Sequence, residues 1–196
     1  EDRHKYLPWL RTQRQRGRLV VVDANLRPAI VPDMTAYQAS VLAALCEADI
    51  IKASDDDLQI LGFMDADPLM AARTLLEQTR ARWLALTLGA RGAALLCREG
   101  KKAWHASEAA PVIVADTVGA GDCFLAGLLA ALLDRPAMHA ARNAQELTLD
   151  DGDVRAMLSQ AVASASLCVQ RTGCAPPTQE DVRMRLSGAP ARIVTL

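Results

Sequence analysis

The chain has 196 residues, a length that favours one domain over two. Hydrophobic residues make up 51% of it and charged residues 23%, which is typical of a globular protein and excludes a disordered chain. The 22 basic and 23 acidic side chains nearly balance, so the basic surplus of a nucleic-acid binder is missing, and no apolar run approaches the roughly 20 residues that span a bilayer.

Predicted strands and helices alternate along the chain. The first 18 residues are rich in arginine, but their acidic tip, Glu1 and Asp2, favours a solvated helix over a targeting peptide. Strands are predicted at 19–23 (buried on both faces), 49–52, 82–87, 93–97, 102–105 and 112–114. Helices are predicted to begin at Asp33, Ser54, Asp67, Gly121 and Asp153, the last one ending at Gly173. Residues 135–152 are expected to form a loop with some helix, and the alternation favours an α/β domain with a mostly parallel sheet.

The five cysteines are odd in number and scattered through mostly apolar stretches: Cys46, Cys97, Cys123, Cys168 and Cys174. No CxxC pair occurs and the three histidines lie far apart, so a zinc site has no support in the sequence. We expect buried free thiols in a cytoplasmic protein.

The stretch Asp116-Thr-Val-Gly-Ala-Gly-Asp122 is the most informative one. Two glycines precede an apolar helix, whose first amides and positive dipole end favour an anion. An ordinary strand-to-helix turn with Asp122 as a first-turn acid is the alternative. The lysine of a P-loop is missing, and Phe124 stands where a dinucleotide fingerprint needs its third glycine.

A carboxylate beside an anion pocket suggests phosphoryl transfer to an alcohol. A phosphoryl group bound directly against Asp122 would be repelled by it, whereas a hydroxyl group would not. Asp122 could then accept the hydroxyl proton while the amides of Gly119 to Gly121 stabilise charge on the transferred group. A proton acceptor next to amides that stabilise a phosphoryl group indicates a kinase for a small alcohol.

The same residues resemble the signature of the ribokinase-like, PfkB-type carbohydrate kinases. Three further motifs stand in that family's order: Asp23-x-Asn25-x-Arg27-Pro28, the run from Asp49 to Leu58, and Thr87-Leu-Gly89-x-x-Gly92. The resemblance covers about residues 18 to 177 and is strongest to bacterial fructokinases, with 2-keto-3-deoxygluconate kinases next. It implies a layered α/β fold with a mostly parallel central sheet flanked by helices.

The resemblance also implies a role for each matching residue. Asp122 corresponds to the catalytic base, and Gly119, Ala120 and Gly121 correspond to the anion hole. Asn25 and Arg27 match sugar-binding positions. Ser54, Thr87, Gly89, Gly92, Val162 and Ser166 match positions along the nucleotide. Asp57 matches an acid that orders magnesium, here through a water, with Asp56 as a substitute, and the carbonyls of Asp116 and Val118 match a monovalent-cation site.

By this resemblance, residues 1–196 are the C-terminal, nucleotide-binding and catalytic portion of one ribokinase-like domain. The family's Gly-Gly sugar motif and small β-sheet lid are not found upstream of Asp23. The implied activity is ATP-dependent phosphorylation of fructose or a related ketose, with Mg²⁺ and a site for K⁺, and with a homodimer as the complete enzyme. A 2-keto-3-deoxygluconate kinase and a nucleotide-binding module without catalysis remain the alternatives, ahead of a dehydrogenase.

Overall fold

The structure, a computed structural model, describes residues 3–196. The acidic residues at the start of the chain, Glu1 and Asp2, lie outside the described residues. Six strands form the sheet in the order β1-β2-β3-β4-β5-β6. The chain divides into two compact units, and the first comprises the residues up to Leu88 together with Leu95–Ala103 and Arg142–Glu146. The second comprises Gly89–Ala94, Trp104–Ala141 and Leu147–Leu196.

The first unit is a parallel α/β layer. Its elements are α1 (Arg3–Gln15), β1 (Val21–Asp23), α2 (Met34–Leu45), β2 (Ile50–Ser54), α3 (Asp55–Ile60), α4 (Pro68–Gln78) and β3 (Trp83–Thr87). Strands β1, β2 and β3 are parallel, with Val22 opposite Ile51 and Ile51 opposite Leu84. Side chains such as Ile51 and Leu84 are completely buried, which is the expected arrangement for strands covered by crossover helices.

Local capping explains where the helices of this unit begin. Asp33 accepts the amide of Ala36 at the start of α2, and Asp67 accepts that of Leu69 ahead of Pro68 in α4. Ser54 caps α3 in a reciprocal capping box with Asp57. These three helix starts were predicted from the sequence, and the structure confirms them. The solvated helix predicted at the N-terminus is also confirmed as α1, whose side chains are mostly exposed.

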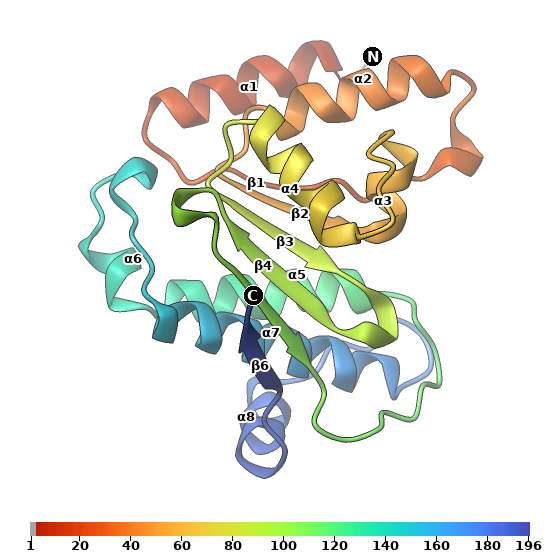
Figure 1. Ribbon diagram of the computed structural model, residues 1–196, viewed down its shortest axis with the longest axis vertical. Helices are drawn as coiled ribbons and strands as arrows, with labels where there is room; N and C mark the ends of the chain where they lie inside the picture. The colour runs from red at the N-terminus through yellow and green to blue at the C-terminus, as the bar shows by residue number, and fades with distance from the viewer. Residues whose placement is uncertain (1–2) are drawn as a thin grey trace. The chain divides into compact units, whose positions relative to one another are not determined.

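The second unit is built on a helix pair. Its elements are β5 (Ala103–Ser107), α5 (Ala120–Leu133), α6 (Pro136–Ala140), α7 (Asp151–Val169), α8 (Gln179–Gly188) and β6 (Arg192–Thr195), while β4 (Ala93–Cys97) spans the boundary between the units. Helices α5 and α7 pack side by side (Figure 1). Gly127 of α5 allows this close approach, because an added Cβ would lie 2.5 Å from the Ser164 hydroxyl oxygen. Strands β5 and β6 are antiparallel, so the sheet is mixed, with parallel strands from β1 to β3 and an antiparallel pair at the β6 edge.

Three details of the sequence-based assignment are wrong. Residues 112–114 form no strand: the backbone there follows the end of α7, where the Val169 carbonyl accepts the Ala115 amide, and Ile113 is 85% exposed. Val21 and Val22 are half-buried and not fully buried, because β1 is the edge strand. Helix α7 ends at Val169, before Gly173.

Helix α8 and strand β6 were missed altogether. Their signal was available, because Thr178 and Asp181 form a capping box directly after the two prolines that end the preceding segment. The loop with some helix predicted at 135–152 is confirmed as α6 and a single 3₁₀ turn at Ala144–Glu146. No helix among residues 3–196 has the length and apolar character needed to cross a membrane.

Candidate functional site

In the first unit, the candidate residues lie where the parallel strands end. Asn25 follows β1, Ser54 is the last residue of β2, and Thr87 is the last residue of β3 and pairs with Ser54 in the sheet register. Ligands of open α/β sheets bind beyond these carboxyl ends. Asn25 is exposed and has a φ of +38°, a backbone conformation that non-glycine residues adopt rarely and often at binding sites.

Arg27 lies beside Asn25 and is exposed, but its guanidinium turns back toward its own chain. Its Nη1 donates a hydrogen bond of 3.1 Å to the carbonyl of Leu26, and its amide donates to the hydroxyl oxygen of Tyr37. The neighbouring Lys52 is a residue that sequence reasoning missed. It is 4% exposed, and its Nζ lies 3.1 Å from Asp23 Oδ1. A lysine inside an otherwise apolar strand was the signal, because a buried ammonium group needs an acidic partner.

Asp57 acts in this structure as a clamp between two segments. Its side chain is buried; Oδ1 accepts the amide of Leu26 at 2.8 Å, and Oδ2 accepts the amide of Ser54 at 2.8 Å. The hydroxyl of Ser54 in turn accepts the amide of Asp57 at 3.0 Å. Asp57 therefore holds the loop that carries Asn25 against the start of α3. The adjacent Asp56 is exposed.

We expect Asp57→Ala to destabilise the protein by about 2–4 kcal/mol, because two amides lose their acceptor in a buried site. Asp56→Ala, at the exposed neighbour, should change stability by less than about 0.5 kcal/mol. Urea unfolding of the natural protein that carries this chain measures both. Equal effects of the two substitutions would show that Asp57 is not a clamp.

In the second unit, the candidate residues gather at the start of α5. Gly119 is the residue before the helix and has a φ of +81°. The amide of Ala120 donates to the Thr117 carbonyl at 3.2 Å and that of Cys123 to the Gly119 carbonyl at 2.8 Å. Among the described residues, the amides of Gly121 and Asp122 have no acceptor. Unpaired amides and the positive end of the helix dipole both favour a negative charge at this turn, and Asp122 is exposed on the same first turn.

Asp116 fixes the turn that leads into this helix. Its Oδ1 accepts the amide of Val118 at 3.0 Å, and its Oδ2 accepts the amide of Gly173 at 2.8 Å. These hydrogen bonds, the one from Val118 first, favour the ionised carboxylate and lower the pKa of Asp116. A lowered folded-state pKa means that Asp116 stabilises the turn fully above its unfolded pKa, and that this contribution is lost as the pH falls through the folded value.

Three thiols lie around the same turn. The Sγ of Cys174 would lie 2.5 Å from a Cβ added to Gly119, the Sγ of Cys168 donates to the Val118 carbonyl at 3.6 Å, and Cys123 follows Asp122. Cys123 and Cys168 are buried, as the sequence predicts, whereas Cys174 is exposed because the chain there has left α7 and runs over the surface. Burial, followed by the hydrogen bond with Cys168, raises the pKa of Cys123 to about 12.

We expect N-ethylmaleimide to modify Cys174 in the folded protein and to spare Cys123. A thiol with a pKa of about 12 instead of 9.0 carries about 1000-fold less of the reactive thiolate near neutral pH. Peptide mapping after a timed reaction measures the two rates, and Cys174→Ser identifies the fast site. Comparable labelling of Cys123 before unfolding would contradict the described burial.

The remaining candidates lie in the same unit. Gly92 has a φ of +92°, and an added Cβ would lie 2.1 Å from the Ala106 carbonyl oxygen, so the turn of Gly89–Arg91 into β4 requires glycine there. Gly89 has a φ of +58° with open space around it. Val162 and Ser166 are both buried in α7.

The structure therefore divides the candidate residues between the two units. Asn25, Arg27, Ser54 and Thr87 lie at the carboxyl ends of the strands in the first unit, and the turn from Asp116 to Asp122 lies in the second.

Comparisons with known proteins agree with these motifs. The family model described as pfkB family carbohydrate kinase matches residues 1–181. A fructokinase of Rhizobium leguminosarum bv. trifolii is 36% identical over 116 residues, which cover 59% of this chain and 34% of that protein. The structure of a Xylella fastidiosa fructokinase with bound ATP superposes with a TM-score of 0.79 at 25% identity, covering 94% of this chain and 56% of that one.

A second solved structure has a different small-molecule ligand. An aminoimidazole riboside kinase of Salmonella enterica, complexed with aminoimidazole riboside and an ATP analogue, gives a TM-score of 0.76 at 28% identity, covering 93% of this chain and 57% of that one. The chain spans between 34% and 54% of the length of the curated relatives that match it first. Because the family model covers nearly the whole chain, the chain belongs to the pfkB family of carbohydrate kinases.

Proposed function

We propose that this chain carries the phosphoryl-transfer centre of an ATP-dependent sugar kinase that acts on fructose or a related ketose. One observation supports this most directly: Asp122 is exposed on the first turn of α5, beside the amides of Gly121 and Asp122, which have no acceptor within the described part of the chain. An acceptor for a proton and a site for an anion thus lie on a single helix turn. Fructokinases among the relatives support the substrate class.

In the proposed reaction, the Asp122 carboxylate accepts the proton of a sugar hydroxyl. The hydroxyl oxygen forms a bond to the γ-phosphorus of ATP, the bond from that phosphorus to the bridging β–γ oxygen breaks, and ADP leaves. The amides of Gly119, Gly121 and Asp122 stabilise the negative charge of the transferred group. The amide of Ala120 contributes less, because it already donates to Thr117.

The other family positions take binding roles in this proposal. Asn25 and Arg27 bind the sugar. The positions along ATP are Ser54, Thr87, Gly89, Gly92, Val162 and Ser166. The strand-end position of Asn25 supports its role, whereas Val162 and Ser166 are buried, so in this proposal both pack beneath the nucleotide without being exposed to it.

Mg²⁺ with ATP and K⁺ beside the anion site complete the proposal. Mg²⁺ would neutralise charge on the phosphates. Since both oxygens of Asp57 already accept amides, the exposed Asp56 is the better placed carboxylate for a water-bridged Mg²⁺. The carbonyls of Asp116 and Val118 would bind K⁺. We further propose a cytoplasmic enzyme that is a homodimer when complete, as the resemblance to the family suggests.

Three alternatives remain distinct from a fructokinase, two with another substrate and one without catalysis. The similarity to an aminoimidazole riboside kinase favours a nucleoside as the second candidate substrate, and 2-keto-3-deoxygluconate is the third. A chain that only binds nucleotide would differ from all of these by lacking turnover.

ADP release by the natural protein that carries this chain, measured with ATP, Mg²⁺ and each of these three compounds, tests the proposal. We expect fructose to give the highest kcat/KM. A higher value for aminoimidazole riboside or 2-keto-3-deoxygluconate would overturn the proposed substrate, and ATP binding without turnover of any of the three would overturn the proposed reaction.

A further inference from the structure

An arginine-lined cavity lies in the first unit, at the end of the strands opposite to Asn25, Ser54 and Thr87. Its volume is about 790 Å³, within the range of about 300–1,000 Å³ of small-molecule sites. Three of the lining residues each stand shortly before a strand: Gly17 before β1, Glu47 before β2 and Arg80 before β3. Since β1, β2 and β3 are parallel, all three mark the amino edge of the sheet.

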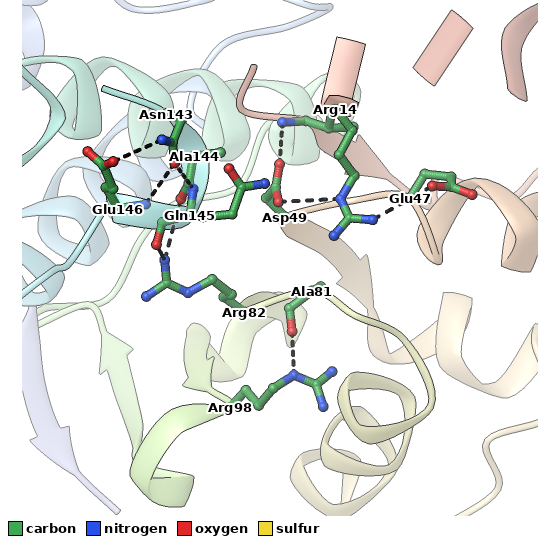
Figure 2. Close-up of polar contacts among 11 residues, drawn as sticks. Arg14, Glu47, Asp49, Ala81, Arg82, Arg98, Asn143, Ala144, Gln145 and Glu146 are labelled. Atoms are coloured by element: carbon green, nitrogen blue, oxygen red, sulfur yellow. Dashed lines mark hydrogen bonds and ion pairs between the residues drawn. The ribbon is translucent and has the colours of Figure 1, made fainter. Parts of the chain in front are cut away.

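The cavity, hereafter the arginine cavity, has a surplus of positive charge. Four arginines line it: Arg11, Arg14, Arg16 and Arg80. Two carboxylates face them, Glu47 in the lining and Asp49 in the wall beside Arg14 (Figure 2). Four guanidinium groups against two carboxylates leave two positive charges, even when both acids are ionised.

The carboxylates leave much of the hydrogen-bonding capacity of these arginines unused. Glu47 accepts Arg11 Nε at 2.8 Å, but it lies 3.9 Å from Arg14 Nη1, and Asp49 lies 3.9 Å from Arg14 Nε. Both of the longer distances exceed a hydrogen bond. The Nε of Arg14 is buried and has no hydrogen-bond acceptor in residues 3–196. Arg16 and Arg80 form no ion pair with any residue of this described part of the chain.

Hydrogen bonds fix the far wall of the arginine cavity. The amide of Ala144 donates to the Gly17 carbonyl at 3.0 Å, and Arg82 Nη1 donates to the Gln145 carbonyl at 3.0 Å. Asn143 is held by Glu146, to which its Nδ2 donates at 3.0 Å, as Figure 2 shows. A site with fixed walls does not have to be ordered when a ligand binds, which favours affinity.

We propose that the arginine cavity binds a small molecule with two or more linked phosphoryl groups. Planar guanidinium groups bind phosphate oxygens in pairs, and two uncompensated positive charges match a diphosphate better than a single inorganic phosphate. The volume exceeds what one phosphate fills. The proposal does not rest on the proposed kinase function, because none of the residues that line the cavity is a candidate residue of the kinase site.

Calorimetry with pyrophosphate tests the proposal on the natural protein that carries this chain. The variant Arg16→Ala/Arg80→Ala removes two exposed side chains without ion pairs within residues 3–196, so it should retain the wild-type Tm. We expect it to weaken pyrophosphate binding by about 100-fold, since two charged hydrogen bonds are lost. Arg18→Ala, at an exposed arginine two residues from Arg16 and outside the cavity lining, is the matched control and should bind as the wild type does.

Inorganic phosphate distinguishes the ligand classes, because we expect it to bind at least about tenfold more weakly than pyrophosphate. Three results would overturn the proposal: a wild-type protein that does not bind pyrophosphate, unchanged binding by Arg16→Ala/Arg80→Ala, or equal losses in that variant and Arg18→Ala. Binding of phosphate as tight as that of pyrophosphate would overturn the requirement for linked phosphoryl groups.

Discussion

Asp122→Asn is expected to lower the kcat of the natural protein by about 100-fold or more, with little change in its affinity for ATP. An amide has nearly the shape of the carboxylate but does not accept the hydroxyl proton, and a positioned general base contributes about 10²–10⁴ in rate. The backbone amides of residues 121 and 122 stay in place, since the substitution changes only a side chain that is exposed on the first turn of α5. Steady-state kinetics and an ATP titration measure the two quantities separately.

Asp134→Asn is the matched control for this prediction. Asp134 is exposed and follows the other end of α5, so the substitution changes the same charge on the same helix without touching its first turn. Its kcat should stay within about twofold of the wild-type value. A fall of less than about threefold in Asp122→Asn would mean that another group accepts the proton, and equal falls in the two variants would point to a general effect of charge.

Gly119→Ala is expected to lower kcat by about 100-fold and stability by about 1–2 kcal/mol. The φ of +81° strains any residue with a Cβ, and an added Cβ would lie 2.5 Å from the Sγ of Cys174. The turn must shift to relieve this contact. A displacement of about 1 Å at a reacting group is enough for such a loss in rate.

Two further substitutions separate the causes of the expected loss. Gly62 has a φ of +89° and open space around it, so Gly62→Ala introduces the same backbone strain without a clash or an effect on kcat. Cys174→Ala combined with Gly119→Ala removes the sulfur and should restore part of the activity. Without any recovery in the double variant, contact with Cys174 would not be what distorts the turn.

The helix starts of the first unit were predictable because each depends on residues close together in the sequence. Asp33, Ser54 and Asp67 each precede a helix with a side chain that accepts an amide two or three residues later, and the structure confirms all three. The α/β layout also follows from alternating patterns. The predicted strand at residues 112–114 failed because three apolar residues predict a strand only when a neighbouring strand is there to pair with them.

The site was predictable in its turns but not in its long-range contacts. Gly119 and Asp122 stand within four residues of each other, so their position at a helix start is visible in the sequence. The clamp from Asp57 to Leu26 and the link from Asp116 to Gly173 join segments 31 and 57 residues apart. Neither spacing nor residue type indicates such partners, and the same holds for the arginine cavity, whose walls come from four separate segments.

A crystal structure of the natural protein with fructose and a non-hydrolysable ATP analogue tests the central proposal most directly. We expect an oxygen of the γ-phosphate within about 3 Å of the amide nitrogens of Gly121 and Asp122, and a fructose hydroxyl within about 3 Å of the Asp122 carboxylate. A γ-phosphate bound away from the start of α5, or a sugar whose hydroxyls all lie beyond hydrogen-bonding distance of Asp122, would contradict it.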